Sequence, residues 1–431
     1  MKICMMTNTY LPHVGGVARS VSTFSEEFLR LGHEVLVVAP TFEGKRLRAS
    51  AEAIVERVPA LENFNGSEFS VRLPLAAGLS DRLDAFQADI IHAHHPFLLG
   101  DTALRVAMNK NVPIVFTHHT RYEDYTHYMP FAEEALKQVA KELPTHFANL
   151  CAGVIAPSES LARLIRRRGV TTPMTVVPTG IDVRAFAEAE GKPFREKLQI
   201  SPDSFVVGHV GRLAQEKNLG YLGEAVARFL ALEPRGRFVV VGDGPARDDL
   251  LGVFEHHGVA DRLIFAGQRT GKALRSAYRA MDMFVFASRS ETQGMVVAEA
   301  MAAGLPVVAL NAPGVREVVR EGENGFLLPS GTTPEAFAEV VQRVARDPAL
   351  RRRLSAGAHA GAARFSRSQC AARMIAFYEE IRRATRAQRA ENDLHPWNVI
   401  IQRLGLEWDL ISSRTQTLAA AVFSDSKEKV S

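Results

Sequence analysis

Clustered cysteines and long apolar runs are both missing from this chain of 431 residues. The 3 cysteines lie far apart and form no Cys-x-x-Cys pair, so we expect neither a disulfide scaffold nor a thiolate metal site, and a reducing compartment suits them. The longest apolar stretch, residues 295–310, is interrupted by Glu299, Gly304 and Pro306 and falls short of the roughly 20 residues that cross a bilayer. Residues 1–7 form too short an apolar run for a signal peptide and predict an opening strand instead.

Common metal and cofactor motifs are also missing. There is no Asp-x-Asp, no His-Glu-x-x-His and no Gly-x-Gly-x-x-Gly, so no motif supports a metal-bound diphosphate, a zinc hydrolase or a dinucleotide fold. A large excess of one charge is missing as well, because 52 Lys and Arg nearly balance 48 Asp and Glu and leave a net charge of +4. This mild excess suits anionic ligands or an anionic membrane face, and it does not require nucleic acid as a partner.

What is present is an alternation of short, β-branched-rich apolar runs with longer segments of helical period. This pattern is typical of strand-helix-strand units in a parallel sheet covered on both faces, so the predicted fold class is doubly wound α/β. Predicted strands lie near residues 3–7, 35–39, 90–93, 114–117, 154–156, 175–177, 205–210, 238–241, 263–265, 283–287 and 307–310. Extended pieces near residues 53–58 and 69–73 interrupt the alternation. Predicted helices include residues 17–31, 158–168, 219–232 and 295–303.

The sheet pattern lapses after residue 177, which places a hinge near residues 178–180. We therefore predict a first domain over residues 1–178, a second over residues 179–370, and C-terminal helices with a frayed tail over residues 371–431. Open parallel sheets bind ligands at the carboxyl ends of their strands, and two such domains would turn these edges toward a shared central cleft. We expect the functional residues on the loops that line this cleft.

The most specific motif covers residues 288–308 and follows a predicted strand. The chain is predicted to turn at Gly294, to run on as a helix and to stop at Gly304, because glycine is frequent beyond a helix end. Glu291 then lies in the loop before the helix and Glu299 on the helix itself. The start of a helix offers N–H groups and a positive dipole end to a phosphate or to sugar hydroxyls, which neighbouring carboxylates also bind. A capped core helix with two solvated glutamates is the alternative.

Two other predicted loops contain glycines that would let a ligand approach the backbone. Gly211 lets the chain turn close to a ligand, and Arg212 and Lys217 project two cations from the same predicted loop, where they would neutralise a diphosphate unless they are merely solvated. In the first half, Gly15 and Gly16 follow the opening strand. They permit close approach of a substrate to the backbone, with a plain tight turn as the alternative.

Histidines gather at the carboxyl ends of two predicted strands. Imidazole is a common metal ligand, but no acidic ligand motif accompanies them, so we expect no metal here. A hydrogen-bonding role toward substrate or a structural role remain as interpretations. The histidines concerned are His92, His94, His95, His118 and His119.

These motifs together resemble glycosyltransferase family 4, retaining enzymes of the GT-B fold, over about residues 1–385. The resemblance rests on Gly15-Gly16-Val17, Gly211-Arg212-Leu213 with Glu216-Lys217, Val241-Gly242-Asp243-Gly244-Pro245, and the string from Glu291 to Glu299. It implies two Rossmann-like domains facing a central cleft, with a nucleotide diphosphate sugar bound by the second domain and the acceptor by the first.

The resemblance also implies roles for single residues. Arg212 and Lys217 would hold the donor diphosphate, Glu299 the ribose, and Glu291 the transferred sugar together with the backbone at Gly294, Met295 and Val296. The base would lie near Gly242, Gln268 and Arg269, and Gly16 would approach both substrates.

Residues 91–97 and 117–128 are similar to segments of the diacylglycerol glucosyltransferases of bacterial membranes. By that resemblance His119 would be the cleft histidine, although the aromatic residues beside it can equally pack a loop that never touches the acceptor. The implied acceptor-binding residues are Gly15, Gly16, His95, His119, Tyr122, Asp124 and Tyr125. The implied partners are a nucleotide diphosphate sugar, a lipid or other hydroxyl acceptor and an anionic membrane surface, with the chain cytoplasmic or peripheral on the inner face of the membrane.

We therefore expect a retaining hexosyltransferase that moves glucose from UDP-glucose to diacylglycerol. Arg212, Lys217 and the helix start would stabilise the leaving diphosphate without a metal or other cofactor, while His119 and Glu291 orient the sugar. The resemblance implies a front-face displacement, since no residue is a persuasive covalent nucleophile. Other donors (mannose, galactose or N-acetylglucosamine) and a soluble acceptor stay open, as do a nucleotide-sugar epimerase and a non-catalytic sugar-binding protein.

Overall fold

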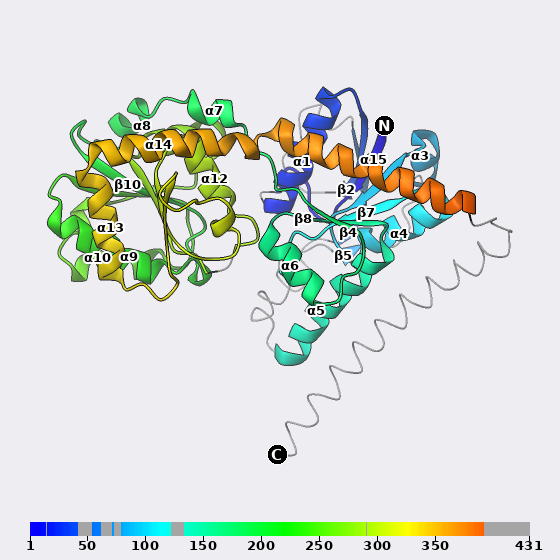
Figure 1. Cartoon of the computed structure of the whole chain (residues 1–431), viewed down its shortest axis with the longest axis horizontal. Helices are drawn as coiled ribbons and strands as arrows, with labels where there is room; N and C mark the ends of the chain where they lie inside the picture. The colour runs from blue at the N-terminus through cyan, green and yellow to red at the C-terminus, as the bar shows by residue number, and fades with distance from the viewer. Residues whose placement is uncertain are drawn as a thin grey trace, which may run out of the picture. The chain divides into compact units, whose positions relative to one another are not determined.

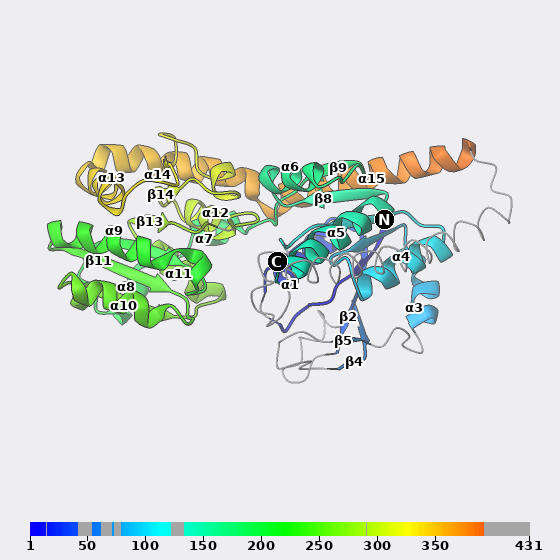
Figure 2. The same ribbon diagram turned by 90° about the horizontal axis from the view of Figure 1, so that it is seen from below.

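The computed structural model describes residues 1–13, 15–41, 54–61, 71–72, 79–121, 133–289 and 291–391. It divides into two compact units, with the break between Pro178 and Thr179 (Figure 1). The first unit contains Met1–Pro178 and the chain from Ala371 onward, and the second contains Thr179–Cys370. Each unit is built around its own parallel sheet with helices on both faces (Figure 2).

The first unit holds a 7-stranded sheet in the order β3-β2-β1-β6-β7-β8-β9, and every strand pair in it is parallel. From the central strand the chain moves outward on one side and then crosses to the other, which is the doubly wound arrangement that the alternating pattern predicts. The strands are β1 (Lys2–Met6), β2 (Glu34–Pro40), β3 (Val55–Val58), β6 (Ile90–Ala93), β7 (Ile114–Thr117), β8 (Gly153–Ala156) and β9 (Met174–Val176). A separate antiparallel pair joins β4 (Ala60–Leu61) to β5 (Val71–Arg72).

Helices of the first unit cover the sheet through apolar stripes of helical period. In α1 (Gly16–Arg30) the buried residues Val21, Phe24 and Phe28 recur every three or four positions, as a helix with one face on a core requires. Ser158 caps α6 (Glu159–Arg167) by accepting a hydrogen bond from the Leu161 N–H at 3.2 Å. The other helices are α3 (Leu79–Phe86), α4 (Leu99–Asn109), α5 (Glu133–Leu150) and α15 (Arg367–Glu391).

The second unit repeats the plan with a 6-stranded parallel sheet in the order β12-β11-β10-β13-β14-β15. Its strands are β10 (Phe205–Val210), β11 (Gly236–Val241), β12 (Leu263–Gly267), β13 (Met283–Phe286), β14 (Val307–Leu310) and β15 (Gly325–Leu328). The sequence pattern did not predict β15, whose four residues lack any β-branched side chain. The helices are α7 (Val183–Ala187), α8 (Lys192–Lys197), α9 (Leu219–Leu232), α10 (Arg247–His256), α11 (Gly271–Arg279), α12 (Met295–Ala302), α13 (Pro334–Arg346) and α14 (Pro348–Ala362).

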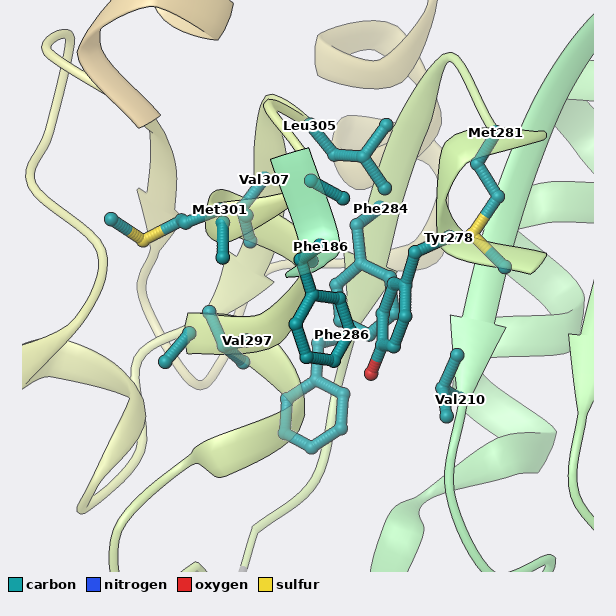
Figure 3. Close-up of a cluster of buried hydrophobic side chains, with 14 of the residues drawn as sticks. Phe186, Val210, Tyr278, Met281, Phe284, Phe286, Val297, Met301, Leu305 and Val307 are labelled. Carbon is teal, nitrogen blue, oxygen red and sulfur yellow. The ribbon is translucent and has the colours of Figure 1, made fainter. Parts of the chain in front are cut away.

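Alternate residues of β13 enter two separate cores. Met283 and Val285 pack with α9 and α13, whereas Phe284 and Phe286 pack on the opposite face with α7, α11 and α12 (Figure 3). Tyr278 lies in this second core with its ring against Phe186 and Phe284, at centroid distances of 5.5 and 5.8 Å. Burial on both faces explains why the strand reads as an unbroken apolar run.

The C-terminal helix differs from the prediction, which set residues 371–431 apart. Instead, the part of α15 after Cys370 belongs to the first unit. The Tyr378 hydroxyl lies 2.6 Å from His92 Nδ1, and the Arg382 guanidinium forms an ion pair with Asp89. Burial of Tyr378 and Ile381 supplies the apolar part of this contact. The tail after residue 391 lies outside the described residues. Among the helices described, none is both long enough and apolar enough to span a bilayer.

Candidate functional site

The predicted donor-site loops of the second unit converge at one edge of its sheet. β10 and β13 are neighbours at the point where the strand order reverses, and loops that follow such strands form the ligand crevice of doubly wound sheets. The loop after β10 carries Gly211, Arg212 and Lys217, and the loop after β13 carries Glu291 and leads into α12. Strand order therefore brings together two motifs that the sequence keeps far apart.

Gly294 opens α12 from a left-handed conformation, with φ of 68° and ψ of 37°. Such a conformation favours glycine, and a Cβ atom here would also lie 3.0 Å from the carbonyl oxygen of Gly314. The helix thus begins at Met295, as predicted. The N–H groups of Met295 and Val296 belong to the first turn, which has no intrahelical acceptors, so they can serve an anionic or hydroxyl-bearing ligand.

A largely buried ion pair links the two loops. Lys217 Nζ lies 2.6 Å from Glu291 Oε1, and the two side chains are only 18% and 15% exposed. Arg212 is arranged differently, because its side chain is 54% exposed and pairs with Glu216 at 2.9 Å. The prediction from the sequence gave Arg212 and Lys217 the same role, as two cations that neutralise a diphosphate. In the structure Lys217 is the inner cation, held by a carboxylate from the other loop, and Arg212 is the outer one.

Glu299 is 1% exposed, which excludes the alternative of a solvated glutamate. Its Oε2 accepts a hydrogen bond from the hydroxyl of Tyr278 on α11 at 2.9 Å, and the same hydroxyl lies 3.2 Å from the carbonyl oxygen of Val296. A buried carboxyl group needs such partners to offset its lost hydration. Sequence analysis missed Tyr278, because it lies 21 residues before Glu299 with no motif around it.

The Glu291 loop is held in place by the neighbouring loop at Gly314 and by Thr179, the first residue of the second unit. A Cβ at Gly314 would meet the Gln293 nitrogen at 3.0 Å and the Glu291 carbonyl oxygen at 3.1 Å, so the two loops touch through their backbones. Gln293 Oε1 accepts from the Thr179 N–H at 3.1 Å, and Gln293 Nε2 donates to the Thr179 carbonyl at 3.3 Å. The loop that carries Glu291 is therefore hydrogen-bonded to Thr179, the first residue of the second unit.

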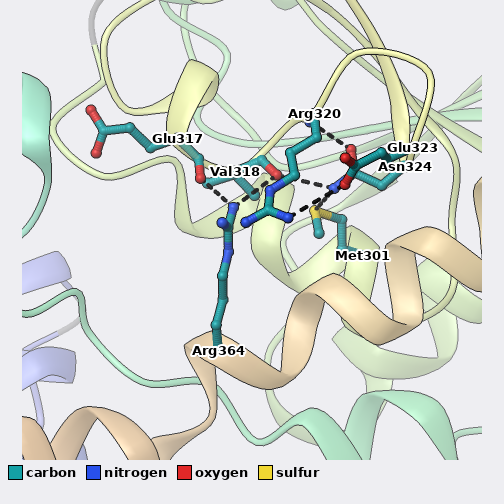
Figure 4. A network of polar contacts seen from close by, with 7 residues as sticks. All are labelled: Met301, Glu317, Val318, Arg320, Glu323, Asn324 and Arg364. Atoms are coloured by element: carbon teal, nitrogen blue, oxygen red, sulfur yellow. Dashed lines mark hydrogen bonds and ion pairs between the residues drawn. The ribbon is translucent and has the colours of Figure 1, made fainter.

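A second network holds the chain beyond Gly314 (Figure 4). Asn324 Nδ2 donates to the Val318 carbonyl at 3.1 Å, and Asn324 Oδ1 accepts from the Arg320 N–H at 2.8 Å. Arg364 donates to the carbonyls of Glu317 and Val318 from the segment after α14. These bonds tie the chain between Gly314 and β15 to the rest of the second unit.

The residues expected near the base also follow neighbouring strands. Gly242 and Gly244, with φ of 146° and 151°, lie after β11 and touch the loop after β10, because added Cβ atoms would lie 1.8 Å from the Gly211 carbonyl oxygen and 2.4 Å from that of Leu213. Gln268 and Arg269 follow β12, and the Gly242 N–H bonds to the Gly267 carbonyl at 3.1 Å. All these predicted residues therefore lie at one sheet edge.

His209 is a buried residue to which sequence analysis gave no role. Its ring stacks near both Phe284 and Phe286, at centroid distances of 6.3 and 5.7 Å. Its Nδ1 is 3.3 Å from the Val285 carbonyl, and its Nε2 has no hydrogen-bond partner in the described part of the chain. Burial lowers the pKa of His209 from 6.5 to about 4, and the nearby Lys217 charge acts in the same direction. His209 is thus neutral at physiological pH.

The first unit has a corresponding edge between β1 and β6, where its own strand order reverses. Gly15 is the extended N-cap of α1, and a Cβ there would lie 3.1 Å from His13 Nε2. At Gly16 a Cβ would meet nothing within 4 Å, so the fold itself does not require glycine there. His95 Nδ1 accepts from the Asn8 N–H at 3.0 Å, which joins the two loops.

The histidines at this edge are hydrogen-bonded to one another and to neighbouring hydroxyl groups. His94 Nδ1 lies 2.9 Å from His119 Nε2, and His92 lies 2.6 Å from both Thr117 Oγ1 and the Tyr378 hydroxyl. Burial lowers the pKa of His92 and His94 well below 6.5 and that of His119 to about 3. Within the described ranges, no group of three or more His, Cys, Asp or Glu side chains is placed to hold a metal ion. Tyr122, Asp124 and Tyr125 lie outside the described residues, so their acceptor role stays a prediction.

Comparison with known proteins covers both units. Residues 14–185 match the family described as Glycosyltransferase Family 4, and residues 191–360 match Glycosyl transferases group 1. Alpha-monoglucosyldiacylglycerol synthase of Streptococcus pneumoniae is 32% identical over 335 residues, which are 76% of this chain and 75% of that protein. GDP-mannose-dependent alpha-mannosyltransferase of Mycobacterium tuberculosis is 32% identical over 350 residues, which are 79% of this chain and 88% of that protein.

Solved structures agree on the fold. Anabaena HepE in complex with UDP has a TM-score of 0.70 and 20% identity, over 88% of this chain and all of that one. Sucrose-phosphate synthase from Thermosynechococcus elongatus has a TM-score of 0.71 and 21% identity, over 89% of this chain and all of that one. Because the fold is the GT-B fold and the curated relatives reach 32% identity over three quarters of the chain, this protein belongs to the glycosyltransferases with family 4 and group 1 domains.

Proposed function

We propose that this glycosyltransferase moves a glucosyl residue from UDP-glucose to diacylglycerol at a membrane surface, with retention of the anomeric configuration and without a metal ion. The observation that carries the donor half is the inner ion pair of Lys217 and Glu291 at the opening of α12. A cation, a carboxylate and the N–H groups of the first helical turn at one sheet edge match the groups of a nucleotide diphosphate sugar.

The donor would exchange partners with this ion pair. Lys217 would turn to the diphosphate, which frees Glu291 to accept hydrogen bonds from sugar hydroxyls together with the N–H groups of Met295 and Val296. Glu299 would receive the ribose hydroxyls, and Gly242, Gln268 and Arg269 would border the base. The UDP complex of Anabaena HepE supports a uridine donor.

The acceptor half rests on the relatives. Alpha-monoglucosyldiacylglycerol synthases of Streptococcus pneumoniae and Acholeplasma laidlawii are both similar to this chain over 76% of its length. Their product joins glucose to diacylglycerol, which supports a glucosyl donor and a lipid acceptor here. Gly15, Gly16, His95 and His119 lie at the edge of the first unit that would receive the acceptor hydroxyl.

In the proposed reaction, the bond between the anomeric carbon and the diphosphate oxygen breaks as the acceptor oxygen approaches the same face of the sugar. The acceptor's proton passes to an oxygen of the departing UDP, so no covalent intermediate forms. Lys217, Arg212 and the first turn of α12 stabilise the charge that develops on the leaving group, which is commonly the largest contribution to catalysis. Glu291 and His119 hold the sugar in place.

The test presents purified protein with vesicles containing diacylglycerol and with radiolabelled UDP-glucose, UDP-galactose, UDP-N-acetylglucosamine or GDP-mannose in turn. We expect label from UDP-glucose in the extracted lipid, in an α linkage, with equal yield in EDTA. Label that stays in the aqueous phase as intact UDP-glucose would count against diacylglycerol as the acceptor. Loss of activity in EDTA that Mg²⁺ restores would refute the metal-free leaving group.

A mannosyl donor is the second candidate, because the mycobacterial GDP-mannose-dependent relative is also 32% identical to this chain. The same panel of donors decides between them, since incorporation from GDP-mannose without incorporation from UDP-glucose would replace the proposed donor. Conversion of the donor sugar without any acceptor would instead indicate an epimerase.

A further inference from the structure

His94 and His119 form a hydrogen-bonded pair of imidazoles at the predicted acceptor edge. His94 follows β6 and His119 follows the adjacent strand β7, so sheet pairing sets the distance between their backbones. The nitrogens His94 Nδ1 and His119 Nε2 are 2.9 Å apart, and the rings stack with centroids separated by 5.2 Å. His94 is 1% exposed, whereas His119 is only partly buried.

One proton lies between these two nitrogens, and the surroundings of the other ring nitrogen of His94, Nε2, show which of the two carries it. Both rings are neutral, because burial and the neighbouring histidines hold their pKa values far below 6.5. Nε2 of His94 is fully buried and has no hydrogen-bond partner in the described part of the chain. If His119 donated, this nitrogen would carry a buried N–H without an acceptor, which proteins rarely tolerate, whereas an unused lone pair is less uncommon. His94 Nδ1 is therefore the donor.

The surroundings keep His94 in this orientation. Its backbone N–H bonds to the Met6 carbonyl at 3.0 Å, and the His92 ring lies 4.0 Å from its own ring, centroid to centroid. His92 is in turn held between Thr117 Oγ1 and the Tyr378 hydroxyl, each at 2.6 Å. The C-terminal helix α15 thus contributes to the support of the pair, because Tyr378 lies on it.

We propose that His94 is a positioning residue that holds His119 as a neutral imidazole with its proton on Nδ1. Nε2 of His119 is occupied by the His94 donor, so the free end of the ring presents an N–H group. His119 then donates a hydrogen bond to a sugar or acceptor oxygen and does not remove the acceptor's proton. This use of the pair rests on the proposed function, while the tautomer itself is a property of the free protein.

The tautomer can be measured without any substrate. The full chain is labelled with ¹⁵N-histidine, and long-range proton-nitrogen correlation spectra are recorded for the wild type and for His119→Gln, which assigns the His119 signals. We expect a protonated Nδ1 and an unprotonated Nε2 on His119. A protonated Nε2, or a mixture of both tautomers, would overturn the assignment to His94, and neither result bears on whether the protein transfers sugar.

Two variants test the consequence for activity. His94→Leu removes the donor, whereas His94→Asn keeps an amide N–H near the position of Nδ1. Loss of one neutral hydrogen bond should lower kcat about tenfold in His94→Leu with less than a twofold change in the donor KM, and His94→Asn should recover most of that loss. His257→Leu, which breaks a 2.8 Å contact with Glu224 in the second unit, is the control for a lost histidine.

Equal losses in the Leu and Asn variants would contradict the positioning role, because a purely structural histidine gains nothing from a retained donor. Should His94→Leu fail to fold, as judged by circular dichroism and thermal melting, the wild-type spectrum still decides the tautomer. If His119 has the expected tautomer but the protein transfers sugar from none of the donors, the proposed function fails while the pairing of His94 with His119 stands.

Discussion

Replacing Lys217 with methionine separates the structural role of the inner ion pair from its proposed catalytic role. Methionine keeps the length of the side chain and removes its charge. In the free protein this leaves the Glu291 carboxylate, 15% exposed, without the ammonium group that now lies 2.6 Å away. In the reaction it removes a cation from the leaving diphosphate. The two effects have different magnitudes and respond differently to a second substitution.

The expected magnitudes follow from burial. Exposed ion pairs contribute about 0–1 kcal/mol and breaking a fully buried pair costs about 3–5 kcal/mol, so a pair with side chains 18% and 15% exposed should lose about 1–3 kcal/mol of unfolding free energy. Removing one preorganised charge from the leaving group should cost about 2.7–4 kcal/mol of transition-state stabilisation, or roughly 10²–10³ in rate. Glu291→Gln in the Lys217→Met background should restore stability, because no uncompensated carboxylate remains, but it should not restore turnover.

The assay combines urea unfolding with initial rates of lipid labelling from UDP-glucose for the wild type, both single variants and the double variant. Lys192→Met is the matched control, since it breaks an exposed pair with Glu196 at 3.9 Å and should change neither quantity measurably. A Lys217→Met variant that folds and keeps its rate within threefold of the wild type would contradict the proposed role of Lys217, and so would wild-type turnover in the double variant.

Three further outcomes follow from contacts in the second unit. Tyr278→Phe keeps the ring packing and removes the hydroxyl that donates a hydrogen bond to Glu299 at 2.9 Å, so the unfolding free energy measured in urea should fall by about 1.5–3 kcal/mol and the donor KM should rise. With a 3′-deoxyribose donor the KM should not rise in this variant. An equal rise with both donors would show that Tyr278 does not act through the ribose. Gln293→Ala removes both hydrogen bonds to Thr179 and should cost about 1–3 kcal/mol in the same measurement, whereas no loss would mean that water replaces the amide. The pKa of His209 is about 4 in the folded protein against an ordinary 6.5, so the unfolded chain binds more protons between these pH values. The unfolding free energy should therefore fall by about 3 kcal/mol for this residue as pH falls through that window. In His209→Leu the unfolding free energy measured in urea should depend less on pH between about pH 7 and 4.5, and an unchanged dependence would contradict the prediction.

Local pattern located most elements of the fold to within a residue or two. The predicted helix over residues 17–31 is α1 (Gly16–Arg30), and the predicted strand over residues 283–287 is β13 (Met283–Phe286). Apolar periodicity acts over a few residues and therefore survives in the sequence. β15 was missed because four residues of glycine, phenylalanine and leucine do not distinguish a strand from a loop.

The candidate site was predicted as a set of residues but not as a set of contacts. Glycine at position 294 could be inferred to open a helix, because the backbone there needs a conformation that only glycine adopts freely. The pairing of Lys217 with Glu291 could not, since the two are 74 residues apart and meet only because β10 and β13 are neighbours.

By itself, then, the sequence determined where most of the strands lie, where several helices lie and which loops carry glycines and charged groups, because each of these depends on residues close along the chain. Only the tertiary structure decided which side chains meet: Lys217 with Glu291, Tyr278 with Glu299, and His94 with His119. The order of the strands and the packing of helices on the sheet set these contacts, and no local pattern encodes them.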